Sequence, residues 1–292
     1  MVANRFSRRD SFVLLGLICI LTVLITGAVC FAADAFSSLE WLWILPVSAL
    51  GSLVALLGLA FLFLWVMCQI VDLNKPQQKE SPFYRTMARW YIDALVVLVR
   101  VRIHAQGLEK TPKDGRFLLV CNHTHDSDPI VLMQAFPKSQ LAFITKRENT
   151  EKFMIGKLQH KLLCQPVNRE NDREALKTIL KCIQLIKEDE VSVGVFPEGY
   201  IFPDRKLHRF RNGVFKIAQK ANVPIVVCTM KNTKYIFKNI ARLKPTDVEL
   251  HLVDVIPAEE LKGVTAVEIG NRVHKLMADD LGPDLVLPEE TT

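Results

Sequence analysis

One short stretch of the chain combines a histidine with an aspartate five positions later. The stretch reads Cys121-Asn122-His123-Thr124-His125-Asp126-Ser127-Asp128-Pro129. A carboxylate that orients an imidazole makes it a base, and such a base can take a proton from an alcohol and turn it into a nucleophile. Taken alone, His123 and Asp128 still favour a structural turn, because Asn, Asp and Ser often satisfy backbone groups in turns.

The elements on either side of this stretch would place its side chains together. Residues 117–121 form an apolar run that predicts a buried strand, and Asp126 or Ser127 can cap a helix that starts directly afterwards. Ligands of α/β sheets gather at the carboxyl ends of the strands. We therefore expect His123 at a strand end, with Asp128 folded back toward its ring.

Three further elements follow along the chain, and each is weak alone. Glu198 and Gly199 end another predicted strand, where a carboxylate and a glycine suit a substrate hydroxyl and a close backbone approach. Arg169 follows a short apolar segment and could grip a phosphate with two hydrogen bonds. The apolar run 223–227, which includes Pro224, fits an ordinary strand.

Other kinds of site find less support in the sequence. His123 and His125 resemble the His-x-His of metal-dependent hydrolases, but the later histidines form no ligand cluster, so we expect no metal. No basic stripe interleaved with aromatic residues points to nucleic acid. The seven cysteines show no paired or metal-type spacing, which favours reduced thiols in a cytoplasmic domain.

The front of the chain is apolar enough to cross a membrane. Residues 11–33 and 41–71 carry no charge, and a bilayer core needs roughly 20 apolar residues in a helix. Arg5, Arg8 and Arg9 before the first segment also fit a cleaved or twin-arginine signal peptide. We predict two transmembrane helices, with the first kept as an anchor.

The charges that flank these segments predict their orientation. Basic residues precede the first segment and follow the second, whereas the loop between them carries Asp34 and Glu40 and no basic residue. The positive-inside rule then puts both ends in the cytoplasm, and we expect the plasma membrane as the location. Residues 72–292 hold the whole net charge of +6, which suits anionic lipid or a phosphorylated substrate.

Behind these segments, short apolar runs alternate with helical patterns. We predict strands at 117–121, 141–145, 191–196, 224–229 and 249–253, and helices at 83–101, 174–187, 212–221 and 265–279. In the first of these helices Arg85, Arg89 and Asp93 form a polar row, which fits a helix on the membrane surface or against the domain. The alternation predicts an α/β fold with a mostly parallel sheet flanked by helices.

The breaks in these patterns predict the domain organisation. A polar segment with two prolines, 74–82, separates the apolar front from the rest of the chain. We expect a membrane anchor at 1–73, a linker with an amphipathic helix at 74–104, the main domain at 105–282 and a loose tail at 283–292.

Four elements in this order resemble the motif set of the 1-acyl-glycerol-3-phosphate acyltransferases, within the glycerolipid acyltransferase superfamily. They are Asn-His-x4-Asp at 122–128, the arginine block at 166–176, Phe-Pro-Glu-Gly at 196–199 and Val-Pro-Ile at 223–225. The resemblance covers roughly residues 107–255 and also includes the segment 143–146. It implies the glycerolipid acyltransferase fold for the main domain.

The resemblance also implies a reaction. His123 would deprotonate the free sn-2 hydroxyl of 1-acyl-glycerol-3-phosphate, with Asp128 holding the imidazole, and the oxygen would attack the thioester of acyl-CoA or acyl-carrier protein. The product would be phosphatidic acid, and no cofactor, metal or covalent acyl-enzyme is implied. The resemblance assigns substrate binding to Asn122, Lys146, Arg169, Glu198, Gly199 and Pro224.

One departure from the family pattern concerns the acceptor. The family usually continues Glu-Gly with Thr-Arg-Ser, and that arginine is linked to phosphate binding, whereas here Tyr200-Ile201-Phe202 follows. Four basic residues could substitute for it, or could form a solvated loop: Arg205, Lys206, Arg209 and Arg211. The departure leaves open an O-acyltransferase that acts on another lysolipid or polar lipid. A catalytically silent membrane scaffold is the alternative from another class.

Overall fold

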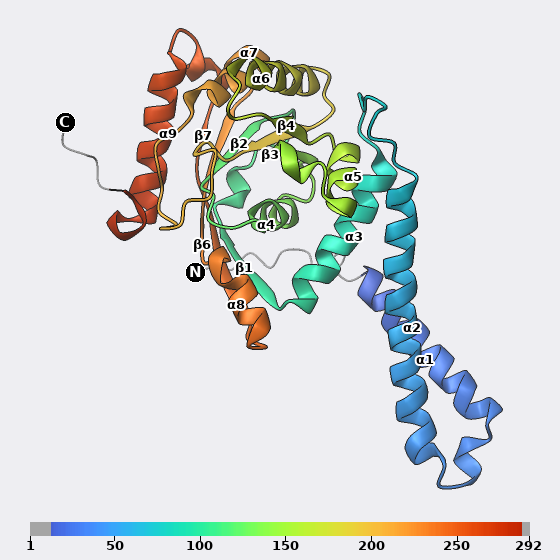
Figure 1. Cartoon of the computed structure of the whole chain (residues 1–292). Coiled ribbons are helices and arrows are strands. Elements are labelled where there is room, and N and C mark those ends of the chain that lie inside the picture. The colour runs from blue at the N-terminus through green and yellow to red at the C-terminus, as the bar shows by residue number, and fades with distance from the viewer. Residues whose placement is uncertain (1–12, 288–292) are drawn as a thin grey trace. The chain divides into compact units, whose positions relative to one another are not determined.

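The computed structural model describes residues 13–287, which form two compact units, 13–74 and 75–287. The first unit is a helical hairpin of α1 (Val13–Ala32) and α2 (Trp41–Gln69) (Figure 1). Both helices are long and apolar enough to cross a membrane, and most of their large apolar side chains are exposed. They match the segments expected at 11–33 and 41–71, of which residues 11 and 12 lie outside the described residues.

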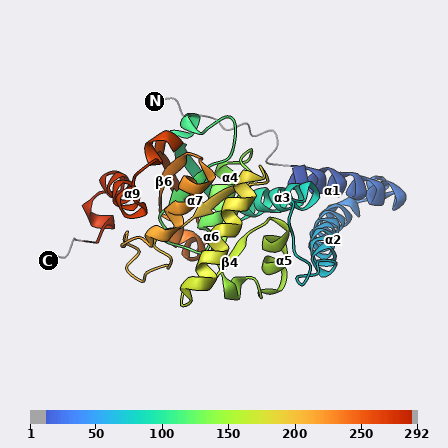
Figure 2. The same cartoon turned by 90° about the horizontal axis from the view of Figure 1, so that it is seen from above.

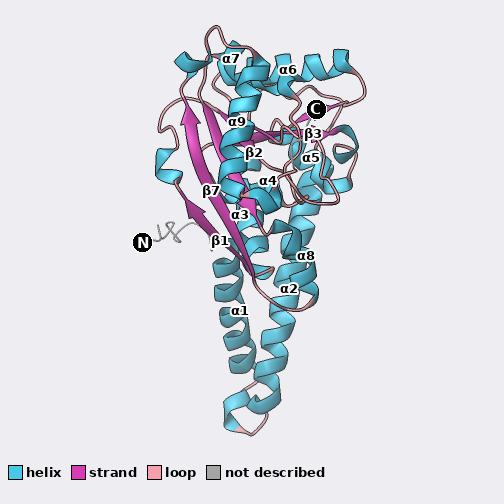
Figure 3. Ribbon diagram, turned by 90° about the vertical axis from the view of Figure 1, so that its left-hand side faces the viewer, coloured by secondary structure: helices cyan, strands magenta, loops and turns pink. Residues whose placement is uncertain are grey.

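The second unit is built on a seven-stranded sheet (Figure 3). Its strands are β1 (Val101–Gln106), β2 (Leu118–Cys121), β3 (Leu141–Lys146), β4 (Gln165–Val167), β5 (Ser192–Val195), β6 (Ile225–Lys231) and β7 (Thr246–Ile256). The order is β1-β7-β6-β2-β5-β3-β4, and every neighbouring pair is parallel except β6 with β7. The central strands β2 and β5 are buried throughout, as expected where helices cover both faces.

Helices cover the two faces of the sheet (Figure 2). They are α3 (Pro82–Leu98), α4 (Asp128–Ala135), α5 (Phe153–Lys161), α6 (Asp172–Lys187), α7 (Lys216–Ala221), α8 (Ile236–Ala241) and α9 (Ala266–Leu281). Residues of α6, α7 and α9 belong to one apolar cluster, and residues of α4 and α8 belong to the other. The mostly parallel α/β fold predicted from the sequence is confirmed.

Most predicted elements are present, but the sequence does not signal all of them. The five predicted strands correspond to β2, β3, β5, β6 and β7, whereas β1, β4, α5 and α8 are additional. β1 is an edge strand of mixed polar and apolar residues with every second side chain exposed, and β4 has only three residues, one a proline. β4 is too short to show a periodic pattern, whereas the apolar–polar alternation of β1 is a strand signal that the prediction overlooked.

Two predicted boundaries are wrong. The main domain does not begin at residue 105, because β1 starts at Val101 and pairs with β7 along its whole length. The segment from 283 is not a loose tail over its described part: Leu207 donates to the carbonyl of Leu285 at 2.8 Å, and Leu287 donates back to Leu207 at 3.1 Å. Residues 288–292 lie outside the described chain.

The predicted amphipathic helix is α3, and its polar row packs inward. Arg85 Nη1 donates to the carbonyl of Leu141 at 2.7 Å and pairs with Glu80, while Asp93 is buried. The row therefore fastens α3 to the start of β3 instead of facing water. The sequence allows α3 to lie on the membrane surface or to pack against the domain, and its polar row packs against the domain.

Candidate active site

A short loop between β2 and α4 brings His123 and Asp128 together. His123 Nδ1 lies 2.9 Å from Asp128 Oδ2, which also accepts the backbone N–H groups of Thr124 at 2.7 Å and His125 at 2.9 Å. Asp128 is fully buried as the first residue of α4. The cap expected from Asp126 or Ser127 is absent: Ser127 occupies the N-cap position, but its hydroxyl bonds the His125 ring at 2.7 Å and makes no capping bond to the helix backbone. The carboxylate of Asp128 organises the loop instead.

This geometry fixes the chemistry open to His123. A carboxylate oxygen only accepts, so Nδ1 carries the hydrogen and Nε2 carries the lone pair. Three hydrogen bonds meet at one oxygen of Asp128 and fix its position relative to the imidazole ring. The pair can therefore act as a general base with a fixed tautomer.

Aromatic rings hold the imidazole in place from behind. The His123 ring stacks on Phe196 with centroids 4.1 Å apart and an interplanar angle of 15°, and Phe196 stacks on Phe143 at 5.9 Å. A Cβ at Gly194 would lie 2.4 Å from the Phe143 ring, so only glycine leaves room for the stack. The sequence motif contains Phe196, but nothing in the sequence indicates that its ring meets the histidine.

Glu198 accepts backbone hydrogen bonds from two segments near the His123 loop. Its Oε1 accepts the backbone N–H of His123 at 2.8 Å, its Oε2 accepts that of His208 at 3.0 Å, and the residue is 3% exposed. Burial raises the pKa of Glu198 to about 7, against the effect of its hydrogen bonds. Glu198 therefore holds the backbone of the proposed base, and the acceptor contact expected of it stays a prediction.

Asn122 joins two strands through its side chain, and the substrate contact expected of it stays a prediction. Its amide donates to the carbonyl of Met230 at 2.9 Å and accepts from the Met230 N–H at 2.7 Å, which ties β2 to β6. Beside it, Cys121 and Cys228 face each other in register on these strands, and both are buried. Burial raises the pKa of both thiols well above the ordinary value.

Two arginines meet over Tyr200, the residue that departs from the family pattern. The guanidinium carbon of Arg169 lies 4.7 Å from the Tyr200 ring centroid and that of Arg211 lies 5.1 Å from it, within cation–π range. Arg211 also donates to the carbonyl of Arg169 at 3.0 Å. Gly199 has a φ of +78°, and a Cβ there would lie 3.0 Å from Arg211 Cδ. The structure thus brings Arg211 to Arg169.

The remaining basic candidates are dispersed. Arg205 Nη1 donates to the carbonyl of Thr124 at 2.6 Å and so contacts the His123 loop. Lys146 Nζ pairs with Glu148 at 3.1 Å, and Arg169 adds to the charges that lower the pKa of Glu148. Lys206 lies beside Asp204, and Arg209 is exposed.

Pro224 lies at the other end of the sheet from His123. It precedes β6, and its carbonyl accepts from Leu118 at the start of β2. His123 follows the carboxyl end of β2, and the two strands run parallel. About five residues at roughly 3.3 Å each separate the two ends. Strand direction therefore separates Pro224 from His123, and its assignment to substrate binding stays a prediction.

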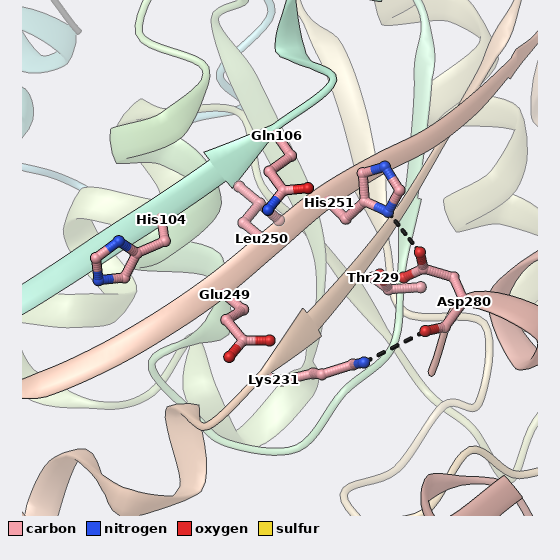
Figure 4. A pocket seen from close by; sticks show the side chains of 8 residues that line it. All are labelled: His104, Gln106, Thr229, Lys231, Glu249, Leu250, His251 and Asp280. Carbon is pink, nitrogen blue, oxygen red and sulfur yellow. Dashed lines mark hydrogen bonds and ion pairs between the residues drawn. The ribbon is translucent and has the colours of Figure 1, made fainter. Parts of the chain in front are cut away.

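A second histidine–aspartate pair lies in a different pocket (Figure 4). His251 Nδ1 is 2.5 Å from Asp280 Oδ1, the Thr229 hydroxyl donates to the other oxygen of Asp280, and Lys231 donates to its carbonyl at 3.3 Å. The pocket of about 150 Å³ is lined by β1, β6, β7 and α9 and contains no residue of the four motifs. Over residues 13–287, no three His, Cys, Asp or Glu side chains are grouped to hold a metal.

Comparison with known proteins finds one family model that matches part of the chain. Residues 102–231 match the family model described as Acyltransferase. The chain is similar to the acyltransferase family over these residues. The match includes the His123 loop, Arg169 and the Glu198–Gly199 turn, and it begins one residue after the start of β1.

Individual relatives agree with this acyltransferase assignment. A Mycoplasma pneumoniae protein named "Probable 1-acyl-sn-glycerol-3-phosphate acyltransferase" is 31% identical over 51% of this chain and 56% of its own length. The Bacillus subtilis 1-acyl-sn-glycerol-3-phosphate acyltransferase is 28% identical over 65% of this chain and 96% of its own. This chain thus spans little more than half of the first relative and nearly all of the second.

A solved structure shares the fold. The crystal structure of the 1-acyl-sn-glycerophosphate acyltransferase from Thermotoga maritima superposes with a TM-score of 0.56 at 18% identity. The superposition covers 90% of this chain and 96% of the other. It establishes the fold of this acyltransferase, including the arrangement of helices around the sheet.

Proposed function

We propose that this acyltransferase transfers an acyl chain to the sn-2 hydroxyl of 1-acyl-glycerol-3-phosphate and forms phosphatidic acid. The observation that carries the proposal is the 2.9 Å contact between His123 Nδ1 and Asp128 Oδ2, which leaves Nε2 as a base. The names of the relatives supply the substrate class. The donor is an acyl thioester, either acyl-CoA or acyl-carrier protein.

The proposed step needs no covalent acyl-enzyme and no separate cofactor or metal. His123 Nε2 takes the hydroxyl proton while the oxygen bonds to the thioester carbonyl carbon. The carbon–sulfur bond then breaks, and the imidazolium returns its proton to the departing thiolate. Asp128 stabilises the charged imidazole between these transfers, and the Phe196 ring limits its rotation.

The acceptor phosphate is assigned to the basic cluster around Tyr200. Arg169 and Arg211 present two guanidinium groups at the Tyr200 ring. Guanidinium groups bind phosphate with paired hydrogen bonds. We assign Arg211 to the part that the missing family arginine would play, because it packs on Gly199 and contacts Arg169.

A second acceptor class has an observation of its own in favour. The Tyr200 ring and Arg211 occupy the turn after Glu198-Gly199, where the family usually has Thr-Arg-Ser. An aromatic ring there suits an acceptor with a larger headgroup than a bare phosphate. Another lysolipid or polar lipid is therefore the alternative acceptor.

The membrane location is part of the proposal. The two candidate spans, with the basic flanks and the Asp34–Glu40 loop, suit an integral protein of the plasma membrane whose acyltransferase domain lies on the cytoplasmic side. Lipids of that membrane would be the acceptor pool.

The base is tested with His123→Ala in membranes supplied with lysophosphatidate and labelled acyl-CoA. Loss of a general base that acts with an orienting carboxylate should lower kcat by roughly 10³-fold or more. His251→Ala is the matched control, because that histidine also pairs with an aspartate but lies in another pocket. Unchanged acyl transfer by His123→Ala would exclude the mechanism and would favour the alternative of a catalytically silent membrane scaffold.

The acceptor is tested with a panel of lysolipids and the variant Arg211→Gln. If Arg211 binds the acceptor phosphate, the variant should raise KM for lysophosphatidate by roughly 10-fold or more while kcat changes little. Arg209→Gln, an exposed arginine two residues away, should leave KM unchanged. Full activity only with acceptors that carry a headgroup would favour the alternative acceptor.

A further inference from the structure

The ends of α3 and α8 form a surface that is both apolar and basic. It comprises Leu98, Phe237, Lys238, Arg242, Leu243 and Lys244, and we call it the α3–α8 surface. Figure 1 shows the two helices. Leu98, Phe237 and Leu243 are 60%, 63% and 81% exposed. Contiguous large apolar side chains at such exposure mark an interaction site on a folded domain.

The two helix ends form one continuous surface. Arg100, just after α3, donates through Nη1 to the carbonyl of Leu243, just after α8, at 2.7 Å. The strands that follow the helices start as parallel neighbours, with Val101 opposite Thr246. Both helices therefore end at the same edge of the sheet.

This edge is also the edge of the proposed active site. β7 runs antiparallel to β6, so it starts where β6 ends, and β6 ends beside the carboxyl end of β2. The contact is direct: the His125 ring meets Phe237 edge-on with centroids 4.6 Å apart. The α3–α8 surface thus borders the loop that carries His123.

The charges on this surface have one sign. Residues 94–106 and 231–246 contain no Asp or Glu. The next acidic residue, Asp247, lies 2.8 Å from His104. Basic side chains around exposed apolar ones fit the boundary of an anionic bilayer, where cations meet headgroups and apolar side chains enter the acyl region. An acidic protein surface would pair with the basic side chains, but it would not bury apolar side chains as exposed as Leu243.

We propose that the α3–α8 surface docks on an anionic lipid bilayer and holds the His123 loop next to the lipid. The two candidate spans place the same chain at a membrane. Docking of this surface is a contact beyond those spans. It would let a lysolipid headgroup reach His123 while its acyl chain stays in the bilayer, and it holds for any lipid acceptor.

The test uses the full chain in lipid nanodiscs of phosphatidylcholine with increasing phosphatidylglycerol. Backbone hydrogen exchange is followed in peptides that cover residues 234–244. The variant carries Lys238→Glu, Arg242→Glu and Lys244→Glu, and the control carries Lys177→Glu, Lys187→Glu and Lys275→Glu on exposed positions of α6 and α9. Both variants change the net charge equally, and the readout requires no acyl transfer.

Docking predicts that phosphatidylglycerol slows exchange in the wild type and in the control. Each basic residue near an anionic surface raises the equilibrium constant for docking by roughly 5-fold. The variant with three charge reversals should therefore lower the ratio of docked to undocked protein by roughly 100-fold or more. Its peptides over 234–244 should lose their protection from hydrogen exchange. Equal exchange of the wild type in both lipids would overturn the proposal. So would equal protection of the variant.

A crosslinking arm separates a bilayer from an acidic protein. Leu243→p-benzoylphenylalanine is irradiated in anionic nanodiscs with purified acyl-carrier protein present. Adducts with lipid support the proposal, whereas adducts with acyl-carrier protein alone would replace the bilayer with a protein partner. Because neither arm measures activity, failure here and failure of the proposed function are distinguishable.

Discussion

At the scale of single residues, one carboxylate oxygen accepts several of the hydrogen bonds that fix the His123 loop. Asp128 Oδ2 accepts from the His123 ring and from two backbone N–H groups, and Glu198 accepts the N–H of His123 itself. Both carboxylates are buried, so each hydrogen bond lies in a medium of low polarity, where it is strong. The loop is therefore preorganised before a substrate arrives.

The raised pKa of Glu198 predicts a pH-dependent stability. The carboxyl titrates at about 7 when folded and near its ordinary value of about 4.3 when unfolded. Between these values the folded protein binds more protons, so the Glu198 contribution is present at low pH and is lost as pH rises toward 7. A shift of this size corresponds to about 3 kcal/mol.

Thermal unfolding in detergent at several pH values measures this effect in Glu198→Gln. The wild type should lose stability relative to the variant as pH rises from about 4.5 to about 7. Glu170→Gln, at an exposed position, serves as the control and should follow the wild type. A constant difference between the wild type and Glu198→Gln across that range would contradict the assignment.

At the scale of elements, α9 is fastened to the sheet by polar contacts as well as by its apolar face. Asp280 binds His251 on β7 and Thr229 on β6, and Lys231 binds its carbonyl. Thr229 and His251 are register partners on β6 and β7. These hydrogen bonds therefore add to the apolar contacts of Met277 and Leu281 in fixing the end of α9.

Asp280→Ala should therefore destabilise the domain. Two side chains would lose a shared acceptor, which costs about 1–3 kcal/mol. The midpoint of thermal unfolding should fall by several degrees, while Asp279→Ala, its exposed neighbour, should have little effect. Equal midpoints for the two variants would show that the polar contacts do not fasten α9.

The arrangement of elements also explains which contacts of the site residues could be predicted from the sequence and which could not. His123 and Asp128 are five residues apart, so local geometry predicts their contact. The partners of Asn122 and Glu198 lie on distant segments and depend on strand register, which one sequence does not reveal. The position of Pro224 also depends on strand arrangement: its motif identifies a strand but does not show at which end of the sheet the proline lies.

At the scale of the whole molecule, the chain joins an apolar hairpin to an α/β domain. The hairpin exposes apolar side chains almost throughout, whereas the domain has apolar clusters on both faces of its sheet. Over residues 13–287, α1 and α2 are the helices that meet the length and apolarity of a membrane span. The flanking charges then decide on which side of the membrane the domain lies.

Labelling of single cysteines in intact cells tests that orientation. An impermeant maleimide should modify Ser37→Cys in the hairpin loop from outside, because that loop is predicted to face away from the cytoplasm. Lys262→Cys in the domain should react only after permeabilisation. Labelling of Lys262→Cys in intact cells would reverse the predicted topology.

The neighbouring thiols of Cys121 and Cys228 affect which nucleophile could receive an acyl group from a thioester. Cys121 lies two residues before His123 and faces Cys228, and burial raises the pKa of both. A thiolate next to a bound thioester would exchange with it and become acylated itself. Because these thiols are protonated and buried between the strands, they would not compete with the hydroxyl of the proposed acceptor for the acyl group.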